Sequence, residues 1–452
     1  MKICYVVDTA VGAAWAFEQL RELRNKYGFD VTAFVTSRQG SLVDKLRSEG
    51  IPFYVRRFGF ISLRDIWTLP FKLIGLARLF RRERFDVVQT HLFRSMVMGR
   101  LAAWLADAPV RLAMVAGPYH LEAHTLRWID RSTCWMDTAV IASCEYTRRL
   151  YRQMGVADDH LELIYYGPDE SIFNPEQVPS TDIREEYGWP SDTPLVGMVA
   201  YFYPPWRSSG LTPPHINGRG IKGHEYLIKA APAILAEFPT AKLLLIGSPF
   251  NEDGQRYMDE LKELVSRLGL QESIIFTGFR SDINNVLRAL DVSVQPSLNE
   301  NLGGTIEALL MECPLVATRV GGMVDSVRDG ETGVLVEPAD PDELARGILQ
   351  LLRDPDRARL MGRAGRKLML ERFTLSHTVR DLSELYDKLL QRGGDARRKY
   401  RLWVSCCRLI ALLPISAYLA LRLITEIYAL HVWDAARELN PLRDRQRAAE
   451  DT

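Results

Sequence analysis

The sequence predicts an α/β protein that consists of two doubly wound domains with parallel sheets. In the first half of the chain, short apolar runs alternate with longer amphipathic stretches, as in parallel sheets wrapped by helices. A polar stretch with several prolines at 174–194 interrupts the alternation and predicts a linker. The alternation restarts at 195–200, and a chain of 452 residues is too long for one ordinary core. We therefore expect two domains of similar size that face each other across a cleft.

The expected strands are the short apolar runs of each half. In the first domain they lie at 2–8, 29–36, 85–91, 110–117, 138–143 and 161–167, with helical patterns such as 13–28 and 41–50 between them. In the second domain they lie at 195–200, 241–247, 273–278, 292–297, 314–322 and 332–338. Sheets of this kind bind ligands beyond the carboxyl ends of their strands, so we expect the site there.

Composition and charge exclude several classes of function. Hydrophobic residues make up 47% and charged residues 25%, which is typical of a folded enzyme and not of a disordered chain. Lys+Arg and Asp+Glu both number 57, so the net charge gives no argument for nucleic acid, and no nucleic-acid partner is expected. The six cysteines form no CxxC pair, which indicates neither a zinc site nor a disulfide framework.

The start of the chain argues against a secreted protein and against a Rossmann dehydrogenase. Residues 1–10 lack the longer apolar region and the cleavage site of a signal peptide, so they predict a buried first strand in a cytosolic protein. No GxGxxG follows that strand, where DTAVGAA offers only Gly12. A Rossmann dehydrogenase is therefore disfavoured.

Residues 295–310, QPSLNENLGGTIEALL, carry a specific chemical signal. Glu300 and Glu307 flank Gly303 and Gly304 between an apolar run and a helical pattern. A glycine turn at the start of a helix exposes backbone N–H groups that suit phosphate oxygens. Glu307, one turn into the helix, would repel a phosphate and suits hydroxyls such as those of a ribose, and together these features describe a nucleotide-sugar. The alternative is a plain strand–turn–helix connection with helix-favouring acids.

A second element follows the first strand of the second domain. The stretch 217–230, NGRGIKGHEYLIKA, places Arg219 and Lys222 before a helix. Two cations at the same sheet edge would neutralise a diphosphate without a metal. Arg207, in YPPWRSS, is a further candidate on the same connection. For Lys222 the alternative is an ordinary solvated lysine at a helix start.

With these motifs, the second half resembles the retaining glycosyltransferases of family four, which have the GT-B fold of two facing Rossmann-like domains. The resemblance covers the acid–glycine–acid motif, PLVAT..GG, the hairpin DGETGVLV and the helix start D..ELA in order. An ordered set of this kind is far more specific than any one motif. The first half resembles the acceptor domain of the family more weakly, through DVVQTH, VIASCEYTRRLYRQMGV and LIYYGPDESIF.

The resemblance implies a retaining transfer of a sugar from a UDP- or GDP-sugar, with no catalytic metal and no other cofactor. Glu307 would hold the ribose hydroxyls of the donor, and Glu300 would contact sugar hydroxyls near the reacting carbon. Lys222, together with Arg219 or Arg207, would bind the diphosphate. The other residues implied at the donor site are Phe279 and Arg280 beside the base, the backbone of Leu302, Gly303, Gly304 and Thr305 near the sugar phosphate, and Gly12 near the donor phosphate.

Departures from the family pattern leave alternatives open. Six residues separate Glu300 from Glu307 where the family has seven, and the usual spacing counts back to Asn299. Either the turn is one residue shorter, or an amide replaces the first acid. The arginine is displaced as well, so Arg207 and Arg219 both remain candidates. The N-terminal loop of the family carries two glycines, whereas this chain has one, at position 12.

Two histidines lie at the carboxyl ends of expected strands, where ligands bind. His91 ends VVQTH and His120 follows the strand before AGPYH. We expect an acceptor-side role for His120. For His91, a role in the site and a polar residue that is satisfied by the backbone are equally open.

Two segments predict contact with a membrane. The segment 56–84 mixes aromatic and aliphatic residues with clustered arginines, which is typical either of an anionic membrane surface or of a helix packed on the domain. In the segment 402–433, the longest charge-free part, 409–421, is shorter than the roughly 20 residues that span a bilayer. It predicts an interfacial helix or one that packs on a partner, and the basic residues before it favour the cytoplasmic face.

Together these features predict a cytoplasmic enzyme on the inner face of the membrane that glycosylates a lipid-linked or polysaccharide acceptor. The expected parts are an acceptor domain at 1–185, a donor domain at 186–375, a helix at 376–392 that crosses back to the first domain, and a basic, apolar helical tail at 393–452. The alternatives are a nucleotide-sugar 2-epimerase of related fold and a non-catalytic GT-B-like binding subunit.

Overall fold

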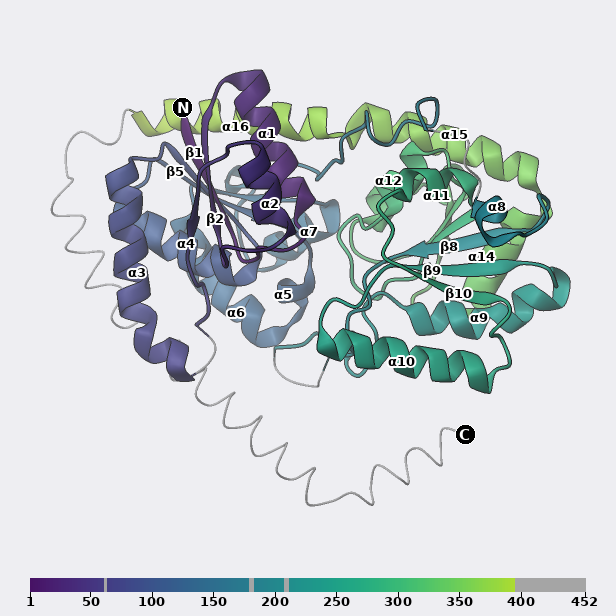
Figure 1. Cartoon of the computed structure of the whole chain (residues 1–452). Coiled ribbons are helices and arrows are strands. Elements are labelled where there is room, and N and C mark those ends of the chain that lie inside the picture. Colours follow the sequence, from purple (N-terminus) through teal and green to yellow (C-terminus); the bar gives the residue numbers. More distant parts are fainter. Residues whose placement is uncertain (61–62, 179–182, 207–210, 395–452) are drawn as a thin grey trace, which may run out of the picture.

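The computed structural model describes residues 1–60, 63–178, 183–206 and 211–394, and Figure 1 shows its two α/β domains side by side. Each domain contains one parallel sheet between layers of helices. The predicted arrangement of two Rossmann-like domains is confirmed.

The first domain contains a seven-stranded sheet in the order β3-β2-β1-β4-β5-β6-β7. Its strands are β1 (Lys2–Val7), β2 (Asp30–Val35), β3 (Phe53–Val55), β4 (Val87–His91), β5 (Val110–Val115), β6 (Ala139–Ala142) and β7 (Leu161–Leu163). Its helices are α1 (Ala14–Tyr27), α2 (Ser41–Ser48), α3 (Leu63–Glu83), α4 (Phe93–Ala106), α5 (Tyr119–Glu122), α6 (His124–Thr133) and α7 (Glu145–Gln153), with 3₁₀ turns η1 (Cys134–Met136) and η2 (Asp158–His160). The sequence did not predict β3, because so short a strand shows no clear apolar alternation.

The second domain contains a six-stranded sheet in the order β10-β9-β8-β11-β12-β13. Its strands are β8 (Leu195–Val199), β9 (Lys242–Ile246), β10 (Ile274–Gly278), β11 (Val292–Gln295), β12 (Leu315–Thr318) and β13 (Val334–Val336). The helices of this half are α8 (Ile183–Tyr187), α9 (His224–Glu237), α10 (Glu252–Arg267), α11 (Ile283–Ala289), α12 (Thr305–Leu310), α13 (Met323–Ser326), α14 (Pro341–Arg353) and α15 (Pro355–Arg372), with the 3₁₀ turn η3 (Pro214–Ile216). The final helix described, α16 (Leu375–Gly394), follows α15.

In both sheets the strand order reverses beside the first strand of the domain. β1 lies between β2 and β4, and β8 lies between β9 and β11. Doubly wound sheets bind ligands in the crevice at the carboxyl ends of such strands. β8 leads toward Lys222, and β11 leads into the acid–glycine turn at 295–310. The topology therefore brings both motifs to one crevice.

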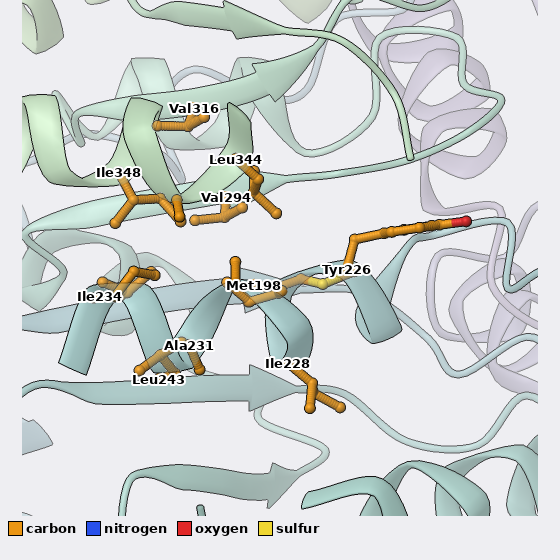
Figure 2. Close-up of a cluster of buried hydrophobic side chains, with 14 of the residues drawn as sticks. Met198, Tyr226, Ile228, Ala231, Ile234, Leu243, Val294, Val316, Leu344 and Ile348 are labelled. Carbon is orange, nitrogen blue, oxygen red and sulfur yellow. The ribbon is translucent and has the colours of Figure 1, made fainter. Parts of the chain in front are cut away.

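The core of the second domain explains how β8 and β11 are held in place. Helices α9 and α14 cover one face of the sheet, and buried apolar side chains from these helices and from all six strands fill the space between them. Figure 2 labels ten of them: Met198, Tyr226, Ile228, Ala231, Ile234, Leu243, Val294, Val316, Leu344 and Ile348. Burial of this apolar layer fixes the strands whose ends carry the site.

Helix α16 returns from the second domain and lies along the first (Figure 1). Leu382 and Tyr386 are fully buried there, and the Tyr386 hydroxyl donates to Gln89 Oε1 at 2.7 Å. Where the chain crosses, a Cβ added to Gly167 would lie 2.1 Å from the carbonyl carbon of Thr374. The close contact and the buried helix tie the end of the second domain to the first.

Helix α3 forms most of the segment that the sequence assigns either to the domain or to a membrane. Leu73 and Phe80 are buried in the first domain, in the layer that contains α4. On the opposite face, Phe71 is 79% exposed and Ile74 is 41% exposed. The helix therefore packs on the domain through one face and leaves apolar side chains at the surface on the other.

The second predicted membrane segment, 402–433, lies outside the residues that the structure describes. Within the described ranges, no helix combines the length and the apolar character that crossing a bilayer requires. Membrane contact by 402–433 therefore stays a prediction.

Candidate active site

A cavity of about 390 Å³ lies between the two domains, where the strand orders reverse. The first domain lines it with residues that follow β4 and β5, and the second with residues that follow β8 and β11. The predicted site residues that line it are His120, Lys222, Asn299 and Glu300. A few polar groups among apolar side chains in a cavity of this size are typical of small-molecule sites. This cavity is the candidate active site.

Lys222 and Glu300 form an ion pair in this cavity, between Nζ of the lysine and Oε2 of the glutamate. Burial disfavours the charged ammonium, but the adjacent Glu300 carboxylate outweighs this effect and raises the pKa of Lys222. The Nζ atom also lies 5.9 Å from the ring centre of Tyr203. Lys222 is therefore a fixed, charged cation in the cavity and not a solvated lysine at a helix start.

The loop of Lys222 lies directly against the strand exit that carries the acid–glycine motif. The Leu298 N–H donates to the Ile221 carbonyl at 2.8 Å. Gly223 has a φ of +76°, and a Cβ there would lie 2.1 Å from the Pro296 carbonyl oxygen. Only glycine allows this approach, which joins the two distant motifs into one site.

We expect Gly223→Ala to lower sugar transfer by about 10²-fold and to destabilise the protein by roughly 2–3 kcal/mol, because the new Cβ forces the two loops apart. Gly218→Ala is the matched control. Gly218 has a similar φ of +70°, but no atom lies within 4 Å of its added Cβ. Transfer assays and urea unfolding of both variants measure the difference, and equal effects of the two substitutions would contradict this account of the loop contact.

Asn299 and Glu300, the two candidates for the first acid position, face different partners. Glu300 faces Lys222, whereas Nδ2 of Asn299 donates across the cleft to Oε2 of Glu122 in the first domain. Gly321 holds the backbone of this turn, because its φ is +53° and a Cβ there would lie 1.7 Å from the Glu300 carbonyl oxygen. The geometry favours the alternative of a shorter turn, with Glu300 beside the cation.

Glu122 links the two domains at this cavity. Its carboxylate accepts from the Tyr146 hydroxyl at 2.5 Å and from Asn299, and Nε2 of His215 lies 3.6 Å away. Burial raises the pKa of Glu122. A glutamate at position 299 would face this carboxylate with like charge, so the amide of Asn299 fits the cleft better.

Glu307 lies in the first turn of α12 with an unsatisfied carboxyl group. Its Oε2 atom is buried and has no hydrogen-bond partner among the described residues. Burial raises the pKa of Glu307 to about 7, and the carboxylates of Glu18 and Glu300 add to the rise. A buried acceptor without a partner costs free energy, so a hydroxyl-bearing ligand would find a ready partner here.

Of the predicted turn residues, Leu302, Gly303 and Gly304 lie between β11 and α12, and Thr305 is the first residue of α12. Leu302 and Thr305 are buried, and Gly303 and Gly304 are half-buried. The Thr305 hydroxyl pairs with that of Ser326 at 2.8 Å. The two glycines let neighbouring side chains pack closely on the turn, because an added Cβ would lie 2.9 Å from Cγ of Glu300 at Gly303 and 2.7 Å from Nε2 of Gln295 at Gly304.

Arg219, Phe279 and Arg280, three further predicted donor residues, do not line the cavity. Arg219 is exposed, and it is not among the described residues that line the cavity. Phe279 is 68% exposed, and Arg280 pairs with Glu186 at 2.8 Å as well as with its neighbour Asp282. Arg207 lies outside the described residues. The structure therefore leaves both arginine candidates for the diphosphate open.

Gly12 lies in the loop between β1 and α1, and its N–H donates to the Ser41 hydroxyl at 2.9 Å. The following residue, Ala13, has a φ of 48° and a ψ of 40°, which is left-handed backbone. This strained alanine stands beside the one glycine of a loop in which the family has two. Only a non-glycine side chain pays a steric cost in this conformation.

We expect Ala13→Gly to stabilise the protein by about 0.5–1 kcal/mol, because relief of the left-handed strain exceeds the entropy cost of glycine. Ala14→Gly is the control, since Ala14 is the first residue of α1 and glycine should destabilise it there. Urea unfolding of both variants tests this expectation. If Ala13→Gly lowers stability as Ala14→Gly does, the assignment of strain to Ala13 is wrong.

His120 lines the cavity and is held from behind by a buried polar network. Its Nε2 atom lies 3.3 Å from Oδ2 of Asp130, and its ring centre lies 5.2 Å from that of Phe93. Asp130 accepts in turn from Arg100 at 2.7 Å and from the Tyr151 hydroxyl at 2.5 Å. The network fixes the imidazole at the cavity wall, which suits the predicted acceptor-side role.

His91 belongs to the core instead. It is fully buried, its Nδ1 lies 3.0 Å from the Tyr166 hydroxyl, and its Nε2 lies 3.1 Å from Nε2 of Gln89. Burial lowers the pKa of His91 to about 3, so the ring is neutral. Of the two alternatives for His91, a role in the site is therefore wrong. The ring nitrogens contact the side chains of Tyr166 and Gln89 rather than the backbone.

Two family models match the chain. Residues 11–167 match the model described as "Glycosyl transferase 4-like domain", and residues 216–354 match the one described as "Glycosyl transferases group 1". The D-inositol 3-phosphate glycosyltransferase of Stackebrandtia nassauensis is 31% identical over 347 residues, which cover 74% of this chain and 70% of that protein. The chain belongs to the group 1 glycosyltransferases.

Other similar proteins agree with this membership. The 2-deoxystreptamine glucosyltransferase of Streptomyces kanamyceticus is 27% identical over 358 residues, which cover 74% of this glycosyltransferase and 84% of that protein. The crystal structure of Anabaena HepE in complex with UDP-glucose has a TM-score of 0.70 at 21% identity, and the match covers 86% of this chain and 100% of that one. The second likeness shows a shared fold, and the predicted GT-B fold and transferase class are both confirmed.

Sequence reasoning missed several residues of this glycosyltransferase cavity. Glu122 meets Asn299 from 177 residues away, and no local pattern marks such a pairing. Glu122 does not itself line the cavity but holds Asn299, which does. Tyr203 and Trp206 line the cavity and belong to a proline-rich insertion whose direction the sequence does not reveal. The available signals were the aromatic residues of that insertion and the acid two positions after His120.

Proposed function

We propose that the chain is a retaining hexosyltransferase that moves a sugar from a UDP- or GDP-sugar to a lipid-linked or polysaccharide acceptor at the cytoplasmic face of a membrane. The observation that carries the proposal is the charged Lys222–Glu300 pair near the buried carboxyl of Glu307, whose Oε2 has no hydrogen-bond partner in the part of the chain that the structure describes. Supporting similarities are the HepE complex with UDP-glucose, the S. aureus TarM complex with UDP, and the capsular polysaccharide biosynthesis glycosyltransferase CapM of Staphylococcus aureus.

In this proposal, Lys222 supplies the charge that the leaving group needs. The bond between the anomeric carbon and the phosphate oxygen breaks, and negative charge develops on the departing diphosphate. The Lys222 ammonium exchanges its contact with Glu300 for one with this phosphate and stabilises that charge. Glu300 is then free to accept hydrogen bonds from sugar hydroxyls. Arg219 or Arg207 adds the second cation, and the charge is neutralised without a metal.

Retention of configuration follows if the acceptor attacks the face that the leaving group vacates. The acceptor oxygen bonds to the anomeric carbon on that face, and its proton passes to the departing phosphate oxygen. Glu307 holds the ribose of the donor during this step through its buried carboxyl. His120 lies on the opposite domain at the cavity wall, where the acceptor would enter.

Acceptor-dependent release of nucleoside diphosphate tests the proposal. The full-length protein is incubated with UDP- and GDP-sugars, with and without a lipid extract of polyprenyl-linked saccharides. We expect release of UDP or GDP only with the extract, and a glycosidic product of the same anomeric configuration as the donor. An epimerase would yield an isomerised sugar without an acceptor, and a binding subunit would release nothing.

The exposed face of α3 supports contact with a membrane. Phe71 and Ile74 lie on this face beside the exposed Arg78, which is the arrangement of an interfacial helix on anionic lipid. Phe71→Glu is expected to reduce sedimentation with phosphatidylglycerol vesicles, whereas Leu360→Glu, at a 64% exposed leucine of α15, is expected to leave it unchanged. Equal binding by both variants would remove this support.

A further inference from the structure

The connection between β8 and α9 carries aromatic residues that the proposed transfer step does not use. Phe202 anchors it, because the ring is fully buried and lies 4.3 Å from the ring of His224, centre to centre. Extended backbone points successive side chains in opposite directions. The neighbours on either side of Phe202 therefore face away from the core, and Tyr203 lines the cavity.

Two aromatic rings of this connection form a wall of the cavity. Tyr203 packs on Phe250 with ring centres 4.7 Å apart and meets Tyr201 edge-on at 6.3 Å, and the Lys222 ammonium lies 5.9 Å from its ring centre. Trp206 lines the same cavity and remains 40% exposed. The wall is thus adjacent to the cation that the proposed chemistry requires.

The first domain holds this wall in place across the cleft. The ring of Tyr119 lies 5.2 Å from that of Trp206, and the Tyr119 hydroxyl donates to the Leu211 carbonyl at 3.2 Å. The Gly218 N–H donates to the Trp206 carbonyl at 2.9 Å. Tyr119 thus packs on the indole and Gly218 holds its backbone, while the ring stays 40% exposed at the cavity and presents apolar surface that a ligand would cover.

We propose that Tyr203 and Trp206 form an acceptor subsite that stacks on the apolar face of a saccharide ring. This inference rests on the proposed function, and it specifies the acceptor as one whose reacting end is a pyranose. The C–H groups on one face of a pyranose carry partial positive charge and match the negative face of an aromatic ring.

The mixture of aromatic and polar groups in the cavity favours a sugar over a purely apolar ligand such as a lipid chain. Besides these rings, the cavity is lined by polar side chains of both domains, namely His120, Asn299 and Glu300. A pyranose has this same division, with an apolar face and a rim of hydroxyls that donate and accept hydrogen bonds. A lipid chain would exclude water from these polar groups and offer no hydrogen bonds in return, at a cost in free energy.

The test compares octyl glycosides of glucose, galactose, mannose and N-acetylglucosamine with 1-O-octylglycerol, which has the same alkyl chain and two free hydroxyls but no ring. Trp206→Ala is expected to raise the KM of the accepted glycosides about tenfold or more, with little change in the Kd of UDP. Trp206→Phe keeps a flat ring and should lose less than about threefold. Trp135→Ala, at a tryptophan that is 53% exposed and does not line the cavity, should match the wild type.

Nucleotide binding tests the proposed function, whereas the use of glycosides as acceptors tests the subsite. If UDP and GDP fail to bind, the proposed function fails. If UDP binds but no octyl glycoside is an acceptor, or octylglycerol is as good as the glycosides, the subsite is overturned. The subsite is also overturned if Trp206→Ala weakens UDP binding and stability without changing the glycoside KM, since the ring would then only pack the domains together.

Discussion

Lys222→Ala is expected to lower the turnover of sugar transfer by at least about 10³-fold at saturating donor. The substitution removes the charged group that offsets the developing charge on the diphosphate. It also leaves Glu300 in the cavity without its partner, and an uncompensated carboxylate there would repel the phosphates. Both effects act most strongly when the leaving group carries its full charge, so turnover should fall more than donor binding.

Initial rates of nucleoside diphosphate release measure this effect. The control is Lys229→Ala, because Lys229 is an exposed lysine of α9, the helix that follows Lys222. In the double variant Lys222→Ala with Glu300→Gln, the added repulsion is removed, so donor affinity should partly recover while turnover stays low. A loss of less than tenfold in Lys222→Ala would show that another group neutralises the diphosphate.

Glu307→Gln is expected to have opposite effects on stability and on nucleotide binding. The folded-state pKa of Glu307 is raised from 4.5 to about 7, so the native protein binds more protons than the unfolded chain between these pH values. Stability therefore falls as the pH rises through this window, by about 3 kcal/mol in total. Glutamine carries no charge, so the variant should be more stable than the wild type by up to this amount at pH 8 and about equal to it at pH 4.

The same substitution should weaken UDP binding by about 10- to 100-fold at pH 8, because an ionised carboxylate accepts hydroxyl donors more strongly than an amide does. In the wild type, affinity for UDP should rise with pH through about 7, as Glu307 loses its proton. Thermal unfolding and UDP titration at several pH values test both effects, with the exposed Glu331→Gln as the control. Loss of stability in Glu307→Gln at pH 8 would contradict the conclusion that burial of the charged Glu307 carboxylate destabilises the fold.

Much of the fold was predictable because buried parallel strands are continuous apolar runs between amphipathic helices. The pairing of the motifs was partly predictable as well, since β8 and β11 are neighbours in a doubly wound sheet and their carboxyl ends meet. The direction in which individual side chains point was not predictable. His91 ends a strand that is buried on both faces, so its alternation gives no sign that the ring points into the core.

The contacts between the domains were the least predictable part of the site. Arg219 lies three residues before Lys222, yet the loop turns its side chain to the surface while Lys222 lines the cavity. From the sequence alone, Asn299 is interpreted as an amide that replaces the first acid of the motif. Its contact with Glu122 shows why an amide fits this position. Such pairings depend on how closely the two sheets approach each other, and no spacing within one domain encodes that distance.

The central claim is that the cavity around Lys222, together with the buried carboxyl of Glu307, is the donor site. Calorimetric titration of the full-length protein with UDP and with GDP tests this claim most directly. We predict binding of at least one nucleotide at one site per chain, with much weaker binding by both Lys222→Ala and Glu307→Gln. Equal affinity in the wild type and both variants, or binding of neither nucleotide, would contradict it.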